Sequence, residues 1–470
     1  MKEPIKIALP KGRLLADTAS LLKNAGWEIK DYKEGTRLYN LKSDRFTSLT
    51  AKIFHEKDIP IQVSIGNYDL GICGLDWIEE LTSKYPGSSI IKIKDLGYGA
   101  GKLVMGSSLL NRYTMSEIRN SFDIIRIASE YPNLAESFAA KNRIKRFSII
   151  PLWGAAEVYP PENAEMVLVS YDKSFSDNLY PLDKVMDYSS YLIANKYCWE
   201  SKDISYLLPS LEKVEKICRK NFSIPITFKP NNPSKIHRYD IKSNIVRIAL
   251  PDGHQQKPTA EFLAKAGIVL DDYTSLGDSR RPSSDVSGVT FKVIRPQDIP
   301  LQLANGNFDL AITGRDWLLN HLYQFPSSPV VELLDLKYGR VKIVAVVSNE
   351  VTVSDPQTLR HFWKDKKLPL RLASEYVNIA DRYARDNHLG MYRVIPTWGA
   401  TEAFLPIDAD LLIENTETGQ TLARHNLKII DTLFESTACL IGYDKANTNP
   451  VKKSIINKIV GKFNMVIKAK

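Results

Sequence analysis

The sequence predicts an α/β protein made of two copies of one module, and three features of the chain support this. At 470 residues the chain is too long for a single hydrophobic core of ordinary size. A long segment of the first half recurs in the second half. Short apolar segments of strand length alternate with segments in which apolar residues recur at helical spacing, a pattern typical of mainly parallel sheets.

The duplication is plainest where residues 58–77 read DIPIQVSIGNYDLGICGLDW and residues 298–317 read DIPLQLANGNFDLAITGRDW. Twelve of these twenty positions are identical. Residues 229–234 are rich in proline, asparagine and serine, a composition typical of a linker. We therefore predict a first half at residues 1–228, a linker at residues 229–243 and a second half at residues 244–470.

Taken in chain order, the first half is expected to begin with a short apolar strand at residues 5–9 and a helix over residues 14–25 that stops at Gly26. Two more buried strands are expected at residues 68–74 and 124–128, and a helix opens after the second of them. Ligands of such sheets usually bind beyond the carboxyl ends of the strands. The turns that follow these strands are therefore the candidate sites.

One turn of the second half has the features of an anion-binding loop. An apolar run of strand length, Asp410–Ile413, leads into the turn, and a helical segment is expected at Leu422–Leu427. Backbone N–H groups at a helix N-terminus carry partial positive charge, and Gly419 lets the chain approach a ligand closely. The hydroxyls of Thr418 and Thr421 are available to donate to phosphate oxygens.

Two acidic residues in the same turn, Glu414 and Glu417, suit a sugar better than a phosphate, because a carboxylate accepts hydrogen bonds from two vicinal hydroxyls. A phosphorylated sugar would satisfy both parts of the turn. The alternative is an ordinary strand-to-helix turn in which Thr416 or Thr418 caps the helix.

The composition is that of a soluble globular protein, with 44% hydrophobic and 25% charged residues. The four cysteines form no CxxC pair, which argues against a disulfide framework and a structural zinc site. No apolar run has membrane-spanning length, and no signal core precedes the first strand, so we expect a cytoplasmic protein without a membrane partner.

The formal net charge of +9 suits anionic small-molecule substrates. Lysine and arginine are spread along the chain, which argues against nucleic acid as a partner. One modest basic cluster is expected on the solvated face of a C-terminal helix. It consists of Lys452, Lys453, Lys458 and Lys462.

A series of short motifs stands in order along the first half: LPKGR at 9–13, DIP at 58–60, DLGICGLD at 69–76, DLGYG at 95–99, YPN at 131–133 and GAAE at 154–157. The second half adds ETGQTL at 417–422. Together these motifs resemble the short catalytic form of the ATP phosphoribosyltransferase family, in two copies that cover nearly the whole chain. The resemblance implies a tandem duplication of a two-lobed module that is similar to type II periplasmic binding proteins, each with a cleft between its lobes.

The resemblance also implies an activity. Members of the family are glycosyltransferases that join N1 of ATP to C1 of phosphoribosyl pyrophosphate (PRPP), with Mg²⁺, and release pyrophosphate as the first step of histidine biosynthesis. It implies that the chain forms a homo-oligomer, and that a regulatory subunit resembling a histidyl-tRNA synthetase is a possible partner.

Matching the motifs residue by residue gives the expected site, for which no metal ligands are predicted. The residues expected to be catalytic are Lys11, Arg13, Arg37 and Arg295. Those expected to bind PRPP through the loop are Glu414, Glu417, Thr418, Gly419, Gln420 and Thr421, and further substrate contacts are expected from Gly12 and Arg340. Asp76 and Asp316 are expected to cap the helices that follow them rather than to bind magnesium.

The two halves depart from the family pattern at different places. The first half keeps the basic turn but has Val169–Ser176 in place of the loop, without its glycine. The second half keeps the loop but has Asp252 where the family has lysine, and this carboxylate would repel pyrophosphate. Arg295 and Arg340 match family arginines that the first half lacks, with His55 and Ala100 at the equivalent positions.

We therefore expect the second half to bind PRPP and the first half to complete the site through Arg37 and its basic turn. The alternative is a catalytically inactive tandem homologue that regulates an enzyme or senses a phosphorylated ligand. A solute-binding protein would share the lobed fold but needs an export signal, which we do not find in residues 1–10.

Overall fold

The computed structural model describes residues 4–36, 40–110, 112–171, 179–212, 244–273, 279–443 and 449–469. The chain divides into two compact units, Met1–Leu152 with Ala156–Arg238 and Trp153–Ala155 with Tyr239–Lys470. Arg37 and the predicted linker at residues 229–243 lie outside the described residues.

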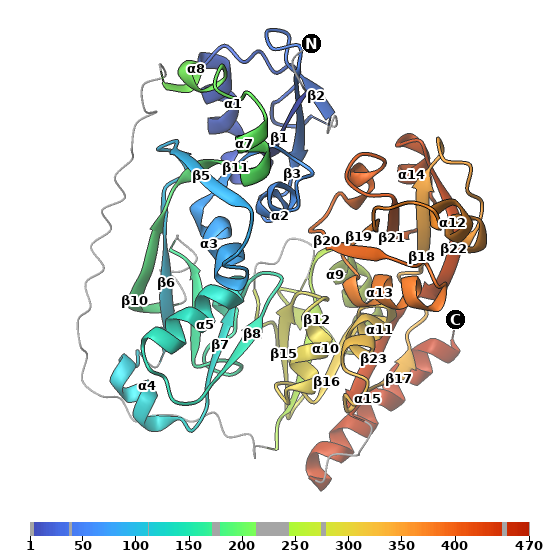
Figure 1. Ribbon diagram of the computed structural model, residues 1–470. Helices are drawn as coiled ribbons and strands as arrows, with labels where there is room; N and C mark the ends of the chain where they lie inside the picture. Colours follow the sequence, from blue (N-terminus) through green and yellow to red (C-terminus); the bar gives the residue numbers. More distant parts are fainter. Residues whose placement is uncertain are drawn as a thin grey trace. The chain divides into compact units, whose positions relative to one another are not determined.

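The first unit has two sheets (Figure 1). One has the strand order β2-β3-β1-β4-β11-β5 and the other the order β10-β6-β9-β7-β8. Its elements are β1 (Ile5–Pro10), η1 (Gly12–Leu14), α1 (Leu15–Asn24), β2 (Asn40–Lys42), β3 (Leu49–Phe54), α2 (Asp58–Ser64), β4 (Leu70–Gly74), α3 (Leu75–Lys84), β5 (Ile90–Asp95), β6 (Gly101–Ser108), α4 (Met115–Ser121), β7 (Ile125–Ser129), α5 (Pro132–Lys141), β8 (Phe147–Pro151), η2 (Ala156–Val158), β9 (Met166–Ser170), β10 (Leu179–Tyr188), β11 (Ser190–Asn195), α7 (Lys196–Ser201) and α8 (Leu208–Glu212).

The second unit repeats this plan, with the strand orders β15-β12-β16-β23-β17 and β20-β19-β21-β18-β22 and a small pair, β13-β14. Its elements are β12 (Val246–Pro251), η3 (Gly253–Gln255), α9 (Gln256–Lys265), β13 (Leu270–Asp271), β14 (Ser283–Ser284), β15 (Val289–Ile294), α10 (Ile299–Ala304), β16 (Leu310–Gly314), α11 (Arg315–Gln324), β17 (Val330–Asp335), β18 (Val341–Ser348), α12 (Pro356–Trp363), β19 (Leu370–Ser374), α13 (Val377–Asp386), β20 (Tyr392–Pro396), η4 (Thr401–Phe404), β21 (Leu411–Thr416), α14 (Gln420–Arg424), β22 (Leu427–Ser436), β23 (Ala438–Tyr443) and α15 (Pro450–Lys468).

Both units are two-lobed α/β modules, as the sequence predicts. In the first unit, β1 pairs in parallel with β3 and β4, and β7 pairs in parallel with β8 and β9. β6 pairs antiparallel with β9 and β10, and β11 pairs antiparallel with β4 and β5. The chain leaves the first sheet after β5 and returns to it at β11. The two lobes of a unit are thus joined by two crossings of the chain.

The interior strand β1 shows why the short apolar segments become strands. Ile5, Ile7 and Leu9 are at most 1% exposed and belong to one cluster with residues of α1, β3 and β4. A strand with neighbours on both edges and helices on its faces has to be apolar along its length. This packing fixes the end of β1, and with it the turn that follows at Lys11.

Two expectations from the sequence were wrong in detail. The helix after the loop spans Gln420–Arg424, and Leu427 already begins β22, so the predicted helix at Leu422–Leu427 ends too late. Lys452 does not lie on a solvated face: it is 3% exposed, and its Nζ lies 2.9 Å from Asp309 Oδ1. A buried lysine needs such a partner, and this pair ties α15 to the segment before β16.

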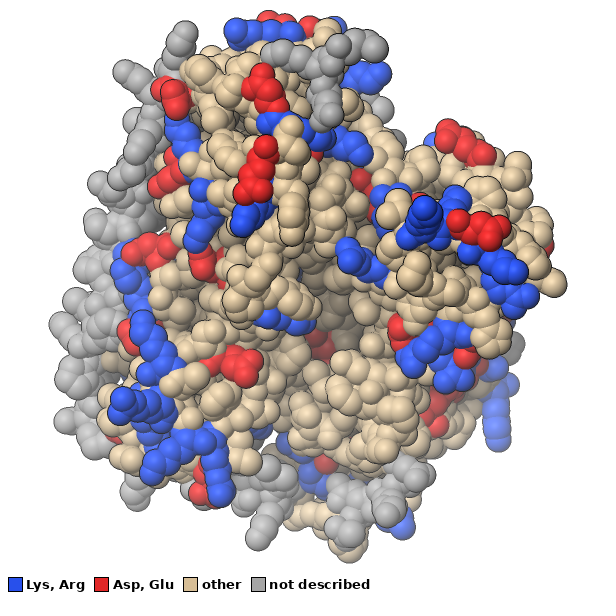
Figure 2. Space-filling view, in the orientation of Figure 1, with Lys and Arg blue, Asp and Glu red and all other residues tan. Residues whose placement is uncertain are grey.

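On the face of the molecule that Figure 2 shows, lysine and arginine side chains lie interspersed with aspartate and glutamate. No large area of a single charge stands out on this face. Among the described residues, no helix is both long enough and apolar enough to cross a membrane.

Candidate active site

In each unit the candidate site lies at the carboxyl ends of three neighbouring strands, β3, β1 and β4 in the first unit and β15, β12 and β16 in the second. The strands around β1 and β12 are parallel, with Pro10 beside Phe54 and Pro251 beside Ile294. The residues that follow them therefore meet at one edge of the sheet. They are Lys11, Gly12, Arg13, His55, Glu56 and Asp76 in the first unit and Asp252, Arg295 and Asp316 in the second.

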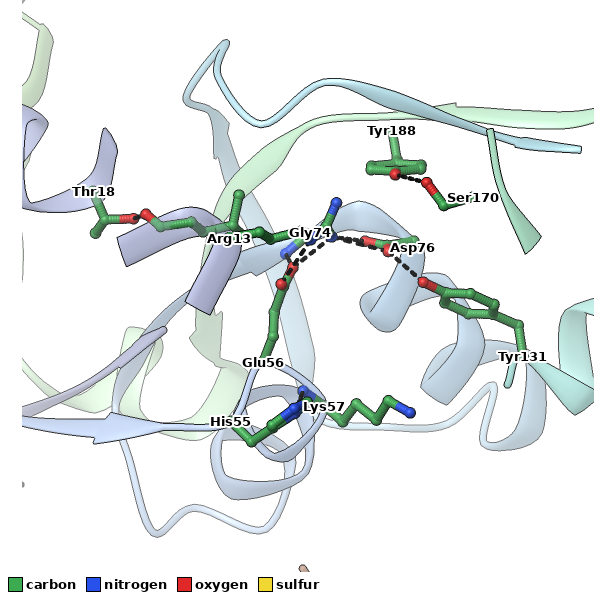
Figure 3. A network of polar contacts seen from close by, with 11 residues as sticks. Arg13, Thr18, His55, Glu56, Lys57, Gly74, Asp76, Tyr131, Ser170 and Tyr188 are labelled. Atoms are coloured by element: carbon green, nitrogen blue, oxygen red, sulfur yellow. Dashed lines mark hydrogen bonds and ion pairs between the residues drawn. The ribbon is translucent and has the colours of Figure 1, made fainter. Parts of the chain in front are cut away.

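In the first unit, Arg13 is held by two carboxylates (Figure 3). Its Nε donates to Glu56 Oε2 at 2.9 Å, and its Nη2 donates to Glu56 Oε1 at 2.7 Å. The same Nη2 lies 3.0 Å from Asp76 Oδ2, and the guanidinium lies 5.0 Å from the ring centroid of Tyr188. Two negative charges thus surround one positive charge, and most donors of Arg13 are occupied.

Burial strengthens this arrangement. Glu56 is 5% exposed and Asp76 is fully buried. Burial raises the pKa of Glu56, although the bonds from Arg13 oppose the shift. In the second unit Pro296 stands at the position of Glu56, so the arrangement has no counterpart there.

The other basic residues of this edge are arranged differently. Lys57 Nζ lies 2.6 Å from Glu130 Oε2 and packs over the ring of Trp77. Burial, with the positive charges of Lys57 and Lys11 nearby, lowers the pKa of His55 to about 4. His55 is therefore neutral at pH 7 and does not replace the charge of the arginine at the equivalent position of the second unit.

In the second unit, Asp252 holds two arginines. Its Oδ2 lies 2.7 Å from Arg280 Nη1 and 3.3 Å from Arg295 Nη1. The Asp252 side chain is 7% exposed, whereas those of Arg280 and Arg295 are 29% and 42% exposed. Asp252 thus offsets the charge of only one of its two guanidiniums, whereas Arg13 alone is bound by two carboxylates.

A hydrogen bond between an aspartate and a tyrosine joins the two lobes of each unit. Tyr131 donates to Asp76 Oδ2 at 2.8 Å, and Tyr376 donates to Asp316 Oδ2 at 2.6 Å. The helix caps are Gly74 and Gly314, so the prediction that these aspartates cap α3 and α11 was wrong. Each aspartate is the second residue of its helix and binds side chains, and the Asp316 carboxylate also accepts from the backbone N–H groups of Asp316 and Trp317.

In the second unit this joint continues toward the loop after β21. Ser436 donates to Asp316 Oδ1 at 2.9 Å, and Asn415 Nδ2 lies 3.1 Å from the Tyr376 hydroxyl. Burial raises the pKa of Asp316, which its bonds to Tyr376 and Ser436 oppose. The joint therefore connects the edge near Asp316 with the last residues of β21.

The predicted loop forms a tight turn between β21 and α14. Gly419 has φ of 74°, and its N–H donates to Thr416 Oγ1 at 2.9 Å. A left-handed backbone favours glycine, and no atom lies within 4 Å of the place where a Cβ would stand. The remaining residues of the turn are accessible: Glu417, Thr418, Gln420 and Thr421 are all exposed.

Glu414 lies at the carboxyl end of β21 and is half-buried. Burial and the nearby Glu375 raise its pKa from 4.5 to about 8, and a bond from the Asn415 N–H opposes the shift. The Glu414 carboxyl is therefore mostly protonated at pH 7.

Arg340 lies in the crossing between β17 and β18 and is 72% exposed, with Nη1 3.6 Å from Glu435 Oε2. A different arginine that sequence reasoning passed over, Arg315, is already paired: it binds Glu332 through Nε at 2.7 Å and through Nη2 at 2.5 Å. Within the described parts of the chain, no group of three or more histidine, cysteine or acidic residues could hold a metal ion.

Two residues of the site, Arg280 and Glu56, were missed from the sequence. Tyr32 and Tyr273 both donate to the carbonyl of the proline that ends the first strand, at 2.6 Å, and so mark equivalent positions. The stretch after Tyr273 contains Arg280 as the stretch after Tyr32 contains Arg37. The spacing differs, five residues from Tyr32 to Arg37 and seven from Tyr273 to Arg280, so counting from the tyrosines would not have identified Arg280, and no motif pointed to Glu56.

The comparisons with known proteins agree with the repeat. The family model for ATP phosphoribosyltransferase matches residues 55–219 and 295–465. An ATP phosphoribosyltransferase of Chlorobaculum parvum is 30% identical over 222 residues, covering 46% of this chain and 70% of the relative. One of Saccharolobus solfataricus is 35% identical over 220 residues, covering 46% of this chain and 68% of the relative.

Similar solved structures include an ATP phosphoribosyl transferase complex from Thermotoga maritima, with 20% identity and a TM-score of 0.39 over 48% of this chain and 100% of that chain. The periplasmic aliphatic sulphonate binding protein of Escherichia coli has 14% identity and a TM-score of 0.29 over 48% of this chain and 69% of that chain. The family match covers both halves and more than half of the chain. The chain belongs to the ATP phosphoribosyltransferase family.

Proposed function

We propose that the chain transfers the phosphoribosyl group of PRPP to N1 of ATP, and that the second half holds PRPP. In this reaction the N1–C1 bond forms, the bond from C1 to the pyrophosphate oxygen breaks, and pyrophosphate leaves with the electron pair. N1 of adenine is already nucleophilic, so the protein has to position the substrates and stabilise the charge of the leaving group.

One observation carries the assignment to the second half: Arg13 is bound by two carboxylates, whereas two arginines of the second half share one. Glu56 and Asp76 lie within 3.0 Å of Arg13 Nη2 and would repel a phosphate bound there. Arg280 and Arg295 share the carboxylate of Asp252 and are partly exposed. Their guanidiniums would attract pyrophosphate, which carries several negative charges.

The loop after β21 completes the proposed site. Thr418, Gly419, Gln420 and Thr421 would bind the 5-phosphate, with Glu414 and Glu417 directed at the ribose hydroxyls. Arg340 is proposed as a further substrate contact because it is exposed at the crossing between the lobes. Mg²⁺ would bind together with PRPP, where it helps to neutralise the pyrophosphate.

The first half keeps Lys11, which makes no ion pair among the described residues, and Gly12, whose φ of 77° suits only glycine without strain. Lys11, Gly12, Arg13 and Arg37 stay proposed site residues. Lys11→Ala tests the contribution of the first half: we expect kcat/KM for PRPP to fall about tenfold, as for loss of one charged contact. Unchanged kinetics would refute the proposed role of Lys11 in the site.

The direct test is incubation of the purified chain with ATP, PRPP and Mg²⁺, with phosphoribosyl-ATP detected by mass spectrometry. We expect product from the wild type and little from Thr418→Lys, which places a long side chain at the proposed 5-phosphate site. A wild type that binds PRPP but forms no product would favour the catalytically inactive, ligand-sensing alternative.

Assembly is part of the proposal. We expect a homo-oligomer; a regulatory subunit resembling a histidyl-tRNA synthetase, as in the short form of the family, is a possible partner. Light scattering of the purified chain tests the first point. Activity that appears only when such a subunit is added would support the second.

A further inference from the structure

The aspartate that replaces the family lysine in the second half has an unusual environment. Asp252 follows β12 directly, and its N–H bonds to the carbonyl of Ile294 at 3.1 Å, which sets it beside the end of β15. Its side chain is almost fully buried. An acidic group at this place would weaken pyrophosphate binding if it faced the ligand alone.

The contacts show that Asp252 does not stand alone. Its Oδ2 accepts a hydrogen bond from Arg280 Nη1 at 2.7 Å and lies 3.3 Å from Arg295 Nη1. These two arginines come from different segments, one before β14 and one after β15, and two guanidiniums this close to one oxygen would repel each other without a negative charge between them. The carboxylate therefore holds together a pair of charges that would otherwise separate.

The two arginines are only partly used by this contact. Each directs one Nη to Asp252, and in the described parts of the chain neither guanidinium makes another side-chain hydrogen bond. Arg13 and Arg315 differ from them, because each binds carboxylates through both Nε and Nη2. Arginine presents five donors in a planar fork, so Arg280 and Arg295 keep donors for an anion.

The second carboxylate oxygen of Asp252 is left without a bond. Asp252 Oδ1 is buried and has no hydrogen-bond partner in the structure. Buried polar atoms are nearly always bonded, so this one calls for an explanation. Asp252 therefore binds both arginines through Oδ2.

We propose that Asp252 is a positioning residue of the transfer reaction, which holds Arg280 and Arg295 as a pair for the pyrophosphate of PRPP. Where the family has a lysine that can bind the anion directly, this half has a carboxylate that fixes the positions of two guanidiniums. This inference rests on the proposed function, since it assumes that pyrophosphate leaves at this edge.

The test compares Asp252→Asn, Asp252→Lys and Asp252→Glu with the wild type. If Asp252 positions the arginines, the asparagine variant binds pyrophosphate about 10- to 100-fold more weakly and loses a similar factor in kcat, with the KM for ATP unchanged. The glutamate variant, which keeps the charge, recovers part of the loss. If Asp252 merely repels phosphate, the asparagine and lysine variants bind pyrophosphate more tightly than the wild type, and this result overturns the proposal.

Two further measurements keep the result interpretable. In an Arg295→Ala background, Asp252→Asn has a smaller effect, because a residue that acts through another loses its effect when that other is removed. Asp381→Asn is the matched control: Asp381 also pairs with an arginine, Arg385, but on the exposed face of α13. We expect wild-type kinetics from it.

Pyrophosphate binding is measured by calorimetry on the full chain and does not require turnover. If the wild type makes no phosphoribosyl-ATP, the proposed function fails while the calorimetric comparison still tests Asp252. If the wild type turns over but Asp252→Asn binds pyrophosphate as well as the wild type does, the proposed function stands and the role of Asp252 is refuted. Thermal unfolding of each variant shows whether it is folded.

Discussion

The arginines of the two halves differ in how many of their donors are already bonded, and this difference was not visible in the sequence. Arg13 matches the family motif, whereas Arg280 belongs to no motif that we used. Yet Arg13 is bound by Glu56 and Asp76, and Arg280 shares one carboxylate with Arg295. A motif predicts which residue type stands at a position, but not which carboxylates the fold brings beside it.

Glu414 gives a prediction at the scale of one residue. Its pKa of about 8 in the folded chain lies above the ordinary value of 4.5, so the fold favours the protonated form. The corresponding stability is fully present below about pH 4.5 and is lost as the pH rises through about 8. Glu414→Gln is neutral at every pH. We expect its melting temperature, relative to the wild type, to rise from pH 5 to pH 9; a constant difference would contradict the shifted pKa.

Gly419 gives a second prediction at the scale of one residue. Because φ is 74° and the space for a Cβ is open, Gly419→Ala should cost only backbone strain, about 1–2 kcal/mol. We expect a modest loss in the free energy of unfolding, measured in urea, and a raised KM for PRPP, because the turn carries the proposed 5-phosphate site. Gly461→Ala in the helix α15 is the control, since its Cβ also meets open space but φ is helical. An unchanged KM for PRPP in Gly419→Ala would show that this turn does not bind PRPP.

At the scale of elements, the strands that carry the site were the most predictable part. The expected strands at residues 5–9, 68–74 and 124–128 correspond to β1, β4 and β7 within two residues. These strands are apolar along their length because they are buried between helices, and such apolar runs can be read directly from the sequence. The extent of α14 and the burial of Lys452 were not predictable, because both depend on which distant segment packs against them.

The joint between the lobes gives a prediction at this scale. Tyr376→Phe leaves Asp316 Oδ2, a buried carboxylate oxygen, without its donor, and should cost about 1–3 kcal/mol in the free energy of unfolding. Tyr131→Phe is the matched change in the first half. It should cost less, because Arg13 still donates to Asp76. Equal losses in urea unfolding would contradict the view that Arg13 supports this aspartate.

At the scale of the whole molecule, the repeat predicted two similar α/β modules, and the structure and the family match confirm them. What the repeat did not predict is how far the two sites have diverged in charge. Glu56 stands where the second half has Pro296, and it reaches Arg13 because β3 and β1 end side by side. The exchange of lysine for Asp252 acts through two arginines that lie 28 and 43 residues further along the chain.

The central claim is that the second half carries the transfer reaction, and Arg295 and His55 occupy equivalent positions from which to test it. We would measure phosphoribosyl-ATP formation by the full chain carrying Arg295→Ala or His55→Ala, after confirming by thermal unfolding that both are folded. The account predicts that Arg295→Ala lowers kcat about 100-fold or more, as expected for loss of a group that stabilises a leaving anion, while His55→Ala stays near the wild type. Full activity in Arg295→Ala, or an equal loss in His55→Ala, would contradict it.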